Sequence, residues 1–412
     1  MTKAIYQALA TVSVTFGIIS DGMHYGWSSP VLPILLSDKS PFEFHPRQIV
    51  WIEVWLLLGV LAGVPIADVA VKRYGGRKPI LAANGLSVTA WIVIALAGTI
   101  KLVYLARFLA GLAARVASVG ASLYIAEISD KRSRQWLNSV INLMMLLGVV
   151  IVYILVPLLP ILTSSLIGVA FLLLQMVSFP CTPEPTRDSA EAQVLEEPLR
   201  EGERITFLEF IKEENSLKIL LIVMCVSCWQ QLAGFGVVVM NLHAILTDAH
   251  CEMNTDTVAV IFATFLVVAT PLGVGLVPKL GSKALLLISS CGTGIVLLVF
   301  GVHLDNERQE EFNSWIPIVL VVLYALVFQL GLGLAPMTIA EELLPRNTQE
   351  IVNTISDSAS VVVSIVMVVL YPLVSTFLGI SVPWYIFSAL TFLLYLFTLF
   401  RIPDTTKCAV RS

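Results

Sequence analysis

Long apolar segments alternate with short polar stretches along almost the whole chain. A helix that rises 1.5 Å per residue needs about 20 residues to cross the ~30 Å hydrocarbon core of a bilayer, and each apolar segment is long enough to do so. The pattern therefore predicts twelve membrane-spanning helices. They are expected at residues 8–30, 50–71, 79–99, 102–125, 137–158, 161–180, 217–246, 257–277, 284–303, 315–343, 351–378 and 382–401.

A polar stretch at 181–216, rich in Pro, Glu and Arg, separates the first six segments from the last six. We expect a six-helix bundle on each side of it, at 1–180 and 217–402, followed by a short tail at 403–412. The stretch itself is predicted to be a cytoplasmic linker that ends in a short amphipathic helix on the membrane surface.

The two groups of segments resemble each other in sequence. KRYGGRKPIL follows the second segment and KLGSKALLLI follows the eighth, while YIAEISDKRSR ends the fourth and TIAEELLPRNTQ ends the tenth. Such correspondences are expected of a duplicated six-helix unit. Two parallel halves around a central cavity are typical of carriers that open to the two sides of the membrane in turn.

Composition and charge agree with a membrane protein. Hydrophobic residues make up 57% and charged residues 13% of the 412, and the mean hydropathy is +0.87, whereas soluble domains carry about 25% charged residues. With both termini in the cytoplasm, 19 of the 25 Lys and Arg residues fall on the inside, four on the outside and two within the fourth segment. Because basic residues concentrate on the cytoplasmic side, we expect an integral multi-pass protein with cytoplasmic termini, by default in the plasma membrane. The opening MTKAIYQ is expected to lead into a retained first span, since no cleavage signature follows it.

Other function classes find little support in the residues. The six Cys residues form neither a disulfide framework nor a metal cluster, and Cys225 and Cys228 are interpreted as small hydrophobic residues of a span. No nucleophile–base set or phosphate-binding loop is visible, so neither an enzyme nor a cofactor is expected. We expect a monomer that works in a lipid bilayer and binds no nucleic acid.

The most informative polar residues lie in the segment 217–246. Gln230 and Gln231 stand side by side in this apolar run, and Gly234 and Gly236 follow them. Amides inside a bilayer need partners or water, and they commonly face the interior of a helix bundle. The pair is therefore predicted to line a substrate cavity. The alternative, that both residues only join neighbouring helices, remains open on residue chemistry alone.

A series of short motifs runs in order through the chain: GMHYGWSSPVLP, GGRKPIL, RFLAG, LYIAEIS, QQLAG, PMTIAEELLP and IPDTTK. Together they resemble the sugar porter family of the major facilitator superfamily, most closely its insect facilitated trehalose and glucose transporters. The resemblance covers nearly the whole chain. It implies an all-α membrane protein with the major facilitator fold, in which twelve transmembrane helices form two six-helix bundles.

The resemblance further implies a carrier for a sugar, a hexose or a disaccharide such as trehalose, that works by facilitated alternating access. Its substrate-binding residues are expected to be Gln230, Gln231, Asn142, Trp27, Asn241, Met337 and Pro336.

The chain departs from the family in its second half. Gly236, Met240 and Asn241 stand where the family has an asparagine and a tyrosine pair, and Met337 stands where it has a tryptophan. Each lost hydrogen bond to a sugar costs about 1 kcal/mol. These losses favour an alternative, a relative that no longer transports and acts as a nutrient sensor or partner-binding membrane protein. The short tail at 403–412 argues against that alternative, because sensors of this fold usually carry long cytoplasmic tails.

Charged residues near the predicted cytoplasmic end are expected to form a gate. By the resemblance, Arg77 and Arg134 of the first half pair with Glu342 of the second half. Glu127 is retained as well, but the two arginines that would face it are replaced. We therefore expect only half of this latch to be intact.

Four charged residues are predicted to lie inside the membrane in the first half, namely Asp21, Glu53, Arg107 and Arg115. A lone charge there costs about 3 kcal/mol or more, so such groups pair or line water. We expect Arg115 to pair with Asp21 or Glu53 in a structural role rather than in a proton relay. His24 stands where proton-coupled relatives have aspartate and passive ones asparagine, and imidazole binds a proton near pH 6.5, so it is a possible proton site. The alternative is a neutral histidine that is hydrogen-bonded to a neighbour.

Overall fold

The structure is a computed structural model that describes residues 3–37, 45, 48–129, 134–182, 214–251, 253–305, 315–344 and 346–402. The regular structure of these residues is helical throughout. The first half contains α1 (Lys3–Gly26), α2 (Ser28–Leu35), α3 (Ile49–Tyr74), α4 (Arg77–Ala95), α5 (Ile100–Ile128), α6 (Arg134–Leu158), α7 (Ile161–Ser178) and the short 3₁₀ helix η2 (Phe179–Cys181). The second half contains α10 (Glu214–Leu232), α11 (Phe235–Asp248), α12 (Thr255–Leu280), α13 (Ser282–Asp305), α14 (Ile316–Leu330), α15 (Ala335–Leu343), α16 (Arg346–Leu378) and α17 (Val382–Arg401).

The helices correspond to the apolar segments of the sequence. Eleven described segments are long and apolar enough to cross a membrane, and α1 supplies the first of the twelve predicted spans. Three predicted spans consist of two helices each: α1 and α2 form the first, α10 and α11 the seventh, and α14 and α15 the tenth. The predicted all-α membrane fold is confirmed.

The break in the seventh span has a clear local cause. Gly234, between α10 and α11, has a φ of +83°, a left-handed conformation that favours glycine. A Cβ at this position would also lie 2.8 Å from the ring of Phe387. The tenth span breaks at residues 331–334, where backbone carbonyl groups leave the helical pattern and become available to side chains.

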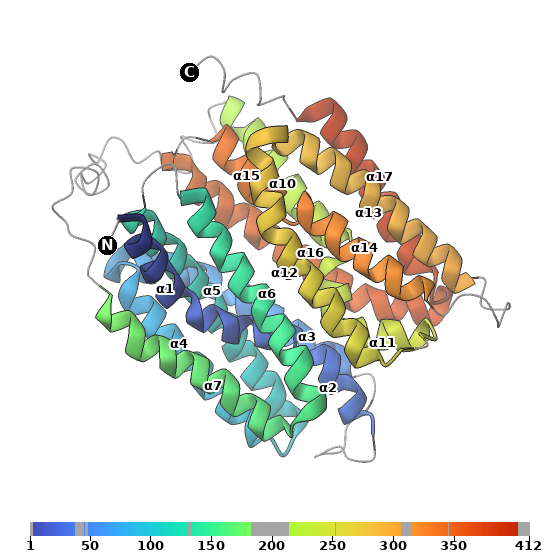
Figure 1. The fold of residues 1–412 in the computed structure, drawn as a ribbon, viewed down its shortest axis with the longest axis horizontal. Coiled ribbons are helices and arrows are strands. Elements are labelled where there is room, and N and C mark those ends of the chain that lie inside the picture. The colour runs from blue at the N-terminus through green and yellow to red at the C-terminus, as the bar shows by residue number, and fades with distance from the viewer. Residues whose placement is uncertain are drawn as a thin grey trace.

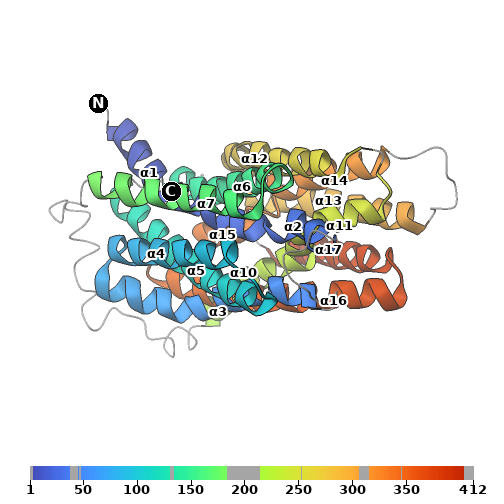
Figure 2. The same ribbon diagram turned by 90° about the horizontal axis from the view of Figure 1, so that it is seen from below.

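Helices α1–α7 lie together in one bundle and α10–α17 in a second bundle beside it, as Figure 1 shows. Within the first bundle α3 packs on α5 and α1 packs on α6; within the second, α13 packs on α17 and α10 on α16. The bundles meet chiefly where α6 packs on α12, α3 on α16 and α2 on α11. Figure 2 shows the same helices turned by 90°, running along the long axis of the molecule.

The predicted bundle boundaries, 1–180 and 217–402, remain predictions. Most of the predicted linker at 181–216 and the whole tail at 403–412 lie outside the described residues.

Candidate functional site

The two adjacent glutamines have different surroundings. The Gln230 Nε2 donates to the carbonyl oxygen of Gly333 at 3.0 Å and to that of Leu332 at 3.4 Å, so this amide holds the break between α14 and α15. The Gln231 Oε1 is buried and has no hydrogen-bond partner among the described residues. Of the pair, Gln231 therefore has the free polar atom that a substrate can use.

The other predicted binding residues lie on several helices of both halves. The Asn241 Nδ2 donates to the Glu53 Oε2 at 3.2 Å and to the carbonyl oxygen of Val237 at 3.3 Å, so this amide is already engaged. Trp27 is buried and lies under the Arg107 guanidinium, 5.5 Å from the ring centre. The remaining three predicted residues are half-buried, Asn142 on α6 and Pro336 and Met337 on α15.

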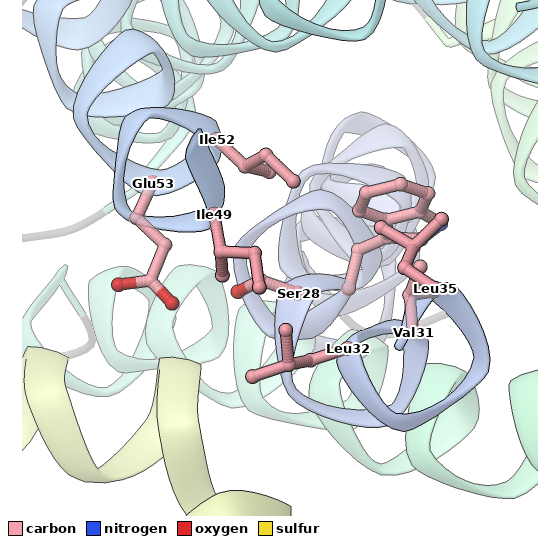
Figure 3. A pocket seen from close by; sticks show the side chains of 8 residues that line it. Ser28, Val31, Leu32, Leu35, Ile49, Ile52 and Glu53 are labelled. Atoms are coloured by element: carbon pink, nitrogen blue, oxygen red, sulfur yellow. The ribbon is translucent and has the colours of Figure 1, made fainter. Parts of the chain in front are cut away.

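A small pocket lies at the junction of α2 and α3. Trp27, Ser28 and Glu53 line it together with apolar residues of both helices. Figure 3 shows the Glu53 carboxylate on α3 close to Ser28 and Ile49. Asn241 on α11 binds this carboxylate from the other half. The pocket therefore adjoins a polar contact between the two bundles.

Arg107 is the most deeply buried charge of the described residues. Its side chain is fully buried, its Nη1 donates to the carbonyl oxygen of His24, and its Nε donates to that of Ile52 at 3.4 Å. The guanidinium interacts electrostatically with the Glu53 carboxylate. Arg107 thus connects α1, α3 and α5, and its positive charge stabilises the negative charge of the buried Glu53 carboxylate.

The predicted pairing of Arg115 with Asp21 or Glu53 is wrong. The Arg115 Nη1 pairs with the Asp357 Oδ2 of α16 at 2.9 Å, and not with Asp21 or Glu53. Asp21 is buried, and no charged or hydrogen-bonding partner acts on its carboxyl group among the described residues. The two partners are 242 residues apart in the chain and belong to different halves, so no local pattern indicated the contact.

His24 stacks on Trp91 with the ring centres 3.8 Å apart. Both ring nitrogens are buried, and neither has a hydrogen-bond partner among the described residues. The expected hydrogen bond of a neutral His24 to a neighbour is therefore absent there. The stacking leaves the ring 1% exposed.

Two predicted gate residues make contacts inside their own halves. The Arg77 Nη2 donates to the carbonyl oxygen of Pro180 at 2.8 Å, and Glu342 accepts a hydrogen bond from the Ser282 hydroxyl. Glu127 is exposed. The Arg134 side chain lies outside what the structure describes, so the pairing of Arg77 and Arg134 with Glu342 remains a prediction.

Sequence reasoning missed two polar residues between the halves. Tyr25 on α1 and Ser364 on α16 both approach Gly236 on α11, next to the Gln231 side chain. The Tyr25 position lies one residue beyond His24 within a recognised motif, which is the only local signal it carries. Ser364 lies in an apolar run without any motif, and only the packing of α16 brings it to this point.

A family model described as "Sugar (and other) transporter" matches residues 37–410. The chain belongs to this family. Among curated relatives of this sugar transporter family member, the facilitated trehalose transporter of Aedes aegypti is 23% identical over 432 residues, which cover 97% of this chain and 53% of that protein. The facilitated trehalose transporter of Drosophila willistoni is 26% identical over 450 residues, covering 98% of this chain and 50% of that protein. The chain thus spans about half the length of the curated relatives it matches.

Solved structures agree on the fold. The crystal structure of a D-xylose–proton symporter superposes with a TM-score of 0.79 at 18% identity, covering 97% of this chain and 99% of that one. The inward open xylose transporter XylE from E. coli gives a TM-score of 0.75 at 18% identity, covering 96% of each chain. The predicted membership in the sugar porter family and the major facilitator fold are confirmed.

In this sugar transporter family member, polar contacts join the halves at the predicted extracellular end. The Ser28 hydroxyl donates to the carbonyl oxygen of Met240 at 3.2 Å. The Ser29 Oγ lies 2.8 Å from the His243 Nδ1 and also accepts the backbone N–H of His243 at 3.1 Å. The Tyr153 hydroxyl donates to the carbonyl oxygen of Val239. Together these bonds hold α2 and α6 of the first half against α11 of the second, so this end of the interface is closed.

Proposed function

We propose that this protein carries a neutral sugar, a hexose or a disaccharide such as trehalose, across a membrane by facilitated alternating access. The observation that carries the proposal is the Gln231 amide, whose Oε1 is buried without a partner at the junction of the two halves. A polyol offers hydroxyl donors that match such an acceptor. The relatives that are named as facilitated trehalose transporters support the same substrate class.

The arrangement of the halves supports a rocking mechanism. The contacts between α2 and α11 close the predicted extracellular end, and the broken seventh and tenth spans leave backbone groups and side chains at mid-membrane. We place both termini in the cytoplasm and the protein, as a monomer, in the plasma membrane. The asymmetric distribution of Lys and Arg residues supports this orientation.

Replacing Gln231 by leucine is expected to lower sugar uptake about tenfold. The variant loses one hydrogen bond to the sugar and leaves a buried sugar hydroxyl group without an acceptor. The measurement is the initial rate of uptake of radiolabelled glucose and trehalose into proteoliposomes. Gln230→Leu is the matched comparison. Since Gln230 binds the carbonyl oxygens of Leu332 and Gly333, its loss should lower the melting temperature as well as uptake. Wild-type uptake by Gln231→Leu would contradict the proposed site.

Transport is expected to be passive. His24 is stacked on Trp91 and 1% exposed, and the Glu53 carboxylate is compensated by Asn241 and Arg107, so neither group offers an accessible proton site in this arrangement. Uptake should stop when the internal and external sugar concentrations are equal. An uncoupler and the variant His24→Asn should each change the initial rate less than about twofold. Accumulation above equilibrium that an uncoupler abolishes would show coupling instead.

A second candidate is a relative of the transporters that binds sugar without carrying it. Asn241 donates a hydrogen bond to Glu53, and Gln230 donates one to the backbone of Gly333. These bonds favour the second candidate, because they leave fewer amide groups free to bind a substrate. Saturable binding of trehalose or glucose to the purified protein, without uptake into proteoliposomes, would identify this case.

A further inference from the structure

A histidine joins the two halves at the predicted extracellular end. His243 on α11 is 1% exposed, and its Nδ1 lies 2.8 Å from the Oγ of Ser29 on α2. Its Nε2 lies 3.3 Å from the Oδ1 of Asp256, in the first turn of α12. Figures 1 and 2 both show α2 beside α11. The His243 ring therefore lies between a hydroxyl group of the first half and a carboxylate of its own half.

These two partners determine which ring nitrogen carries the hydrogen of a neutral His243. A carboxylate only accepts hydrogen bonds, so the hydrogen belongs on Nε2, which faces Asp256. The Nδ1 then accepts the hydroxyl hydrogen of Ser29, whose Oγ in turn accepts the backbone N–H of His243 at 3.1 Å. A second proton on the ring would occupy Nδ1 and turn this acceptor into a donor. The closed contact thus fits the neutral ring and conflicts with the charged one.

Opening of this end changes the surroundings of the ring. When α2 moves away from α11, the Nδ1 loses Ser29 and meets water. Asp256 stays beside the Nε2, because α11 and α12 belong to the same half, and its side chain is already 41% exposed. An imidazole in water binds a proton near pH 6.5, and a neighbouring carboxylate favours the charged form. The open arrangement therefore binds a proton on His243 more readily than the closed one.

The other titratable groups near His243 do not reverse this preference. Tyr153 of α6 meets the ring edge to face with the ring centres 5.4 Å apart, and a phenol is neutral near pH 7. Among the described residues, Asp256 is the only charged group that acts on the ring. The remaining titratable groups described on helices that adjoin α11, or on α11 itself, are Tyr25 of α1, Glu53 of α3, Tyr324 of α14, Tyr371 of α16 and, near the end of α11, Asp248 and His250.

We infer that Ser29, His243 and Asp256 form a pH-sensitive latch, in which His243 takes up one proton from the extracellular side when that side opens. The inference rests on the rocking mechanism of the proposed function. The proton returns to the same side when the latch closes, so transport stays passive. A group that binds a proton near pH 6.5 only in the open form raises the ratio of open to closed protein about tenfold between pH 7.5 and pH 5.5.

Nitroxide labels at positions 36 and 247 measure this opening without any need for transport. Leu36 follows the last residue of α2 and is 56% exposed, and Thr247 lies exposed near the end of α11. The labels are attached through Leu36→Cys and Thr247→Cys in a protein whose native cysteines are replaced by serine. In lipid nanodiscs, the ratio of the long to the short distance between the labels should rise about tenfold from pH 7.5 to pH 5.5.

Variants in the labelled protein assign the effect to the latch. His243→Gln removes the titrating ring, so the distances should no longer depend on pH. His250→Gln is the matched control, because this exposed histidine follows the end of α11, and it should keep the tenfold rise. Asp256→Asn should give a smaller rise, since the charged ring loses its carboxylate. Ser29→Ala should raise the open share about fivefold already at pH 7.5, as the loss of one hydrogen bond does.

The outcomes separate the inference from the proposed function. If the wild type takes up neither glucose nor trehalose, the proposed function fails, while the label distances still decide on the latch. If the distances are the same at both pH values, or if His243→Gln keeps the rise, the latch is overturned and the proposed function stands. A rise that disappears in His250→Gln also overturns the latch, because the exposed histidine then causes it. Should His243→Gln fail to fold, an unchanged rise in Asp256→Asn overturns the latch as well.

Discussion

Arg115→Asp should reduce sugar uptake about 100-fold or more, and the further exchange Asp357→Arg should restore most of it. The Arg115–Asp357 ion pair is 2.9 Å long and joins α5 of the first half to α16 of the second, within membrane-spanning helices. Its side chains are 15% and 44% exposed, so it is neither fully buried nor a surface pair. Breaking a buried pair costs about 3–5 kcal/mol, and the exposure of Asp357 brings our expectation to the lower end of that range.

The position of the pair explains why transport should suffer. Asp357 precedes Ser364 by seven residues, which is two turns of α16 and about 10 Å along its axis, so both residues share one face of the helix. The pair therefore lies nearer the start of α16 than Ser364 does, away from the closed contact between α2 and α11. Two aspartates at this point repel each other across the interface and keep the halves apart.

Lys72→Glu serves as the control for the charge exchange. Lys72 pairs with Asp68 one turn away on the same helix at 2.6 Å, and both side chains are more exposed than Arg115. Such surface pairs contribute about 0–1 kcal/mol, so uptake should change little. The decisive measurement is uptake by the double exchange. If it transports no better than Arg115→Asp, the pair does not act between the halves.

Arg107→Met is expected to lower the free energy of unfolding by about 3 kcal/mol or more. The variant leaves the carbonyl oxygens of His24 and Ile52 without their donor and the 3% exposed Glu53 carboxylate without its compensating cation. It also removes the cation above the Trp27 ring. Because Arg107 joins α1, α3 and α5, the loss should affect the whole first half.

Thermal unfolding of the purified protein in detergent measures this effect. Glu53→Gln in the Arg107→Met background should recover part of the lost stability, since it removes the uncompensated charge. Arg107→Lys should recover less of the lost stability than Glu53→Gln does, because a single ammonium group does not match two separate carbonyl oxygens as the guanidinium does. Arg73→Met is the control: Arg73 lies exposed at the end of α3 over the ring of Tyr74, and its loss should change stability by less than about 0.5 kcal/mol. Equal melting temperatures of Arg107→Met and Arg73→Met would refute the argument.

The residues that the sequence singled out divide into two groups. The motif around Gln230 and Gln231 indicated a polar site in the seventh span, but it did not distinguish the two amides. Only the break of the tenth span, which brings the carbonyl oxygens of Leu332 and Gly333 to Gln230, separates a structural glutamine from a free one. The sequence also indicated the charged residues inside the membrane, because each of them interrupts an apolar segment. Their partners were not, because Arg115 meets Asp357 across 242 residues.

The sequence by itself determined the twelve spans, the all-α fold and the family, because the length and apolarity of each segment and the order of its motifs are properties of neighbouring residues. Only the tertiary structure decided which polar groups are free. The partner of Arg115 and the hydrogen bond between Asn241 and Glu53 both depend on how helices from the two halves pack. Hydrogen bonds and ion pairs act over a few ångströms in space, and distance along the chain does not determine them.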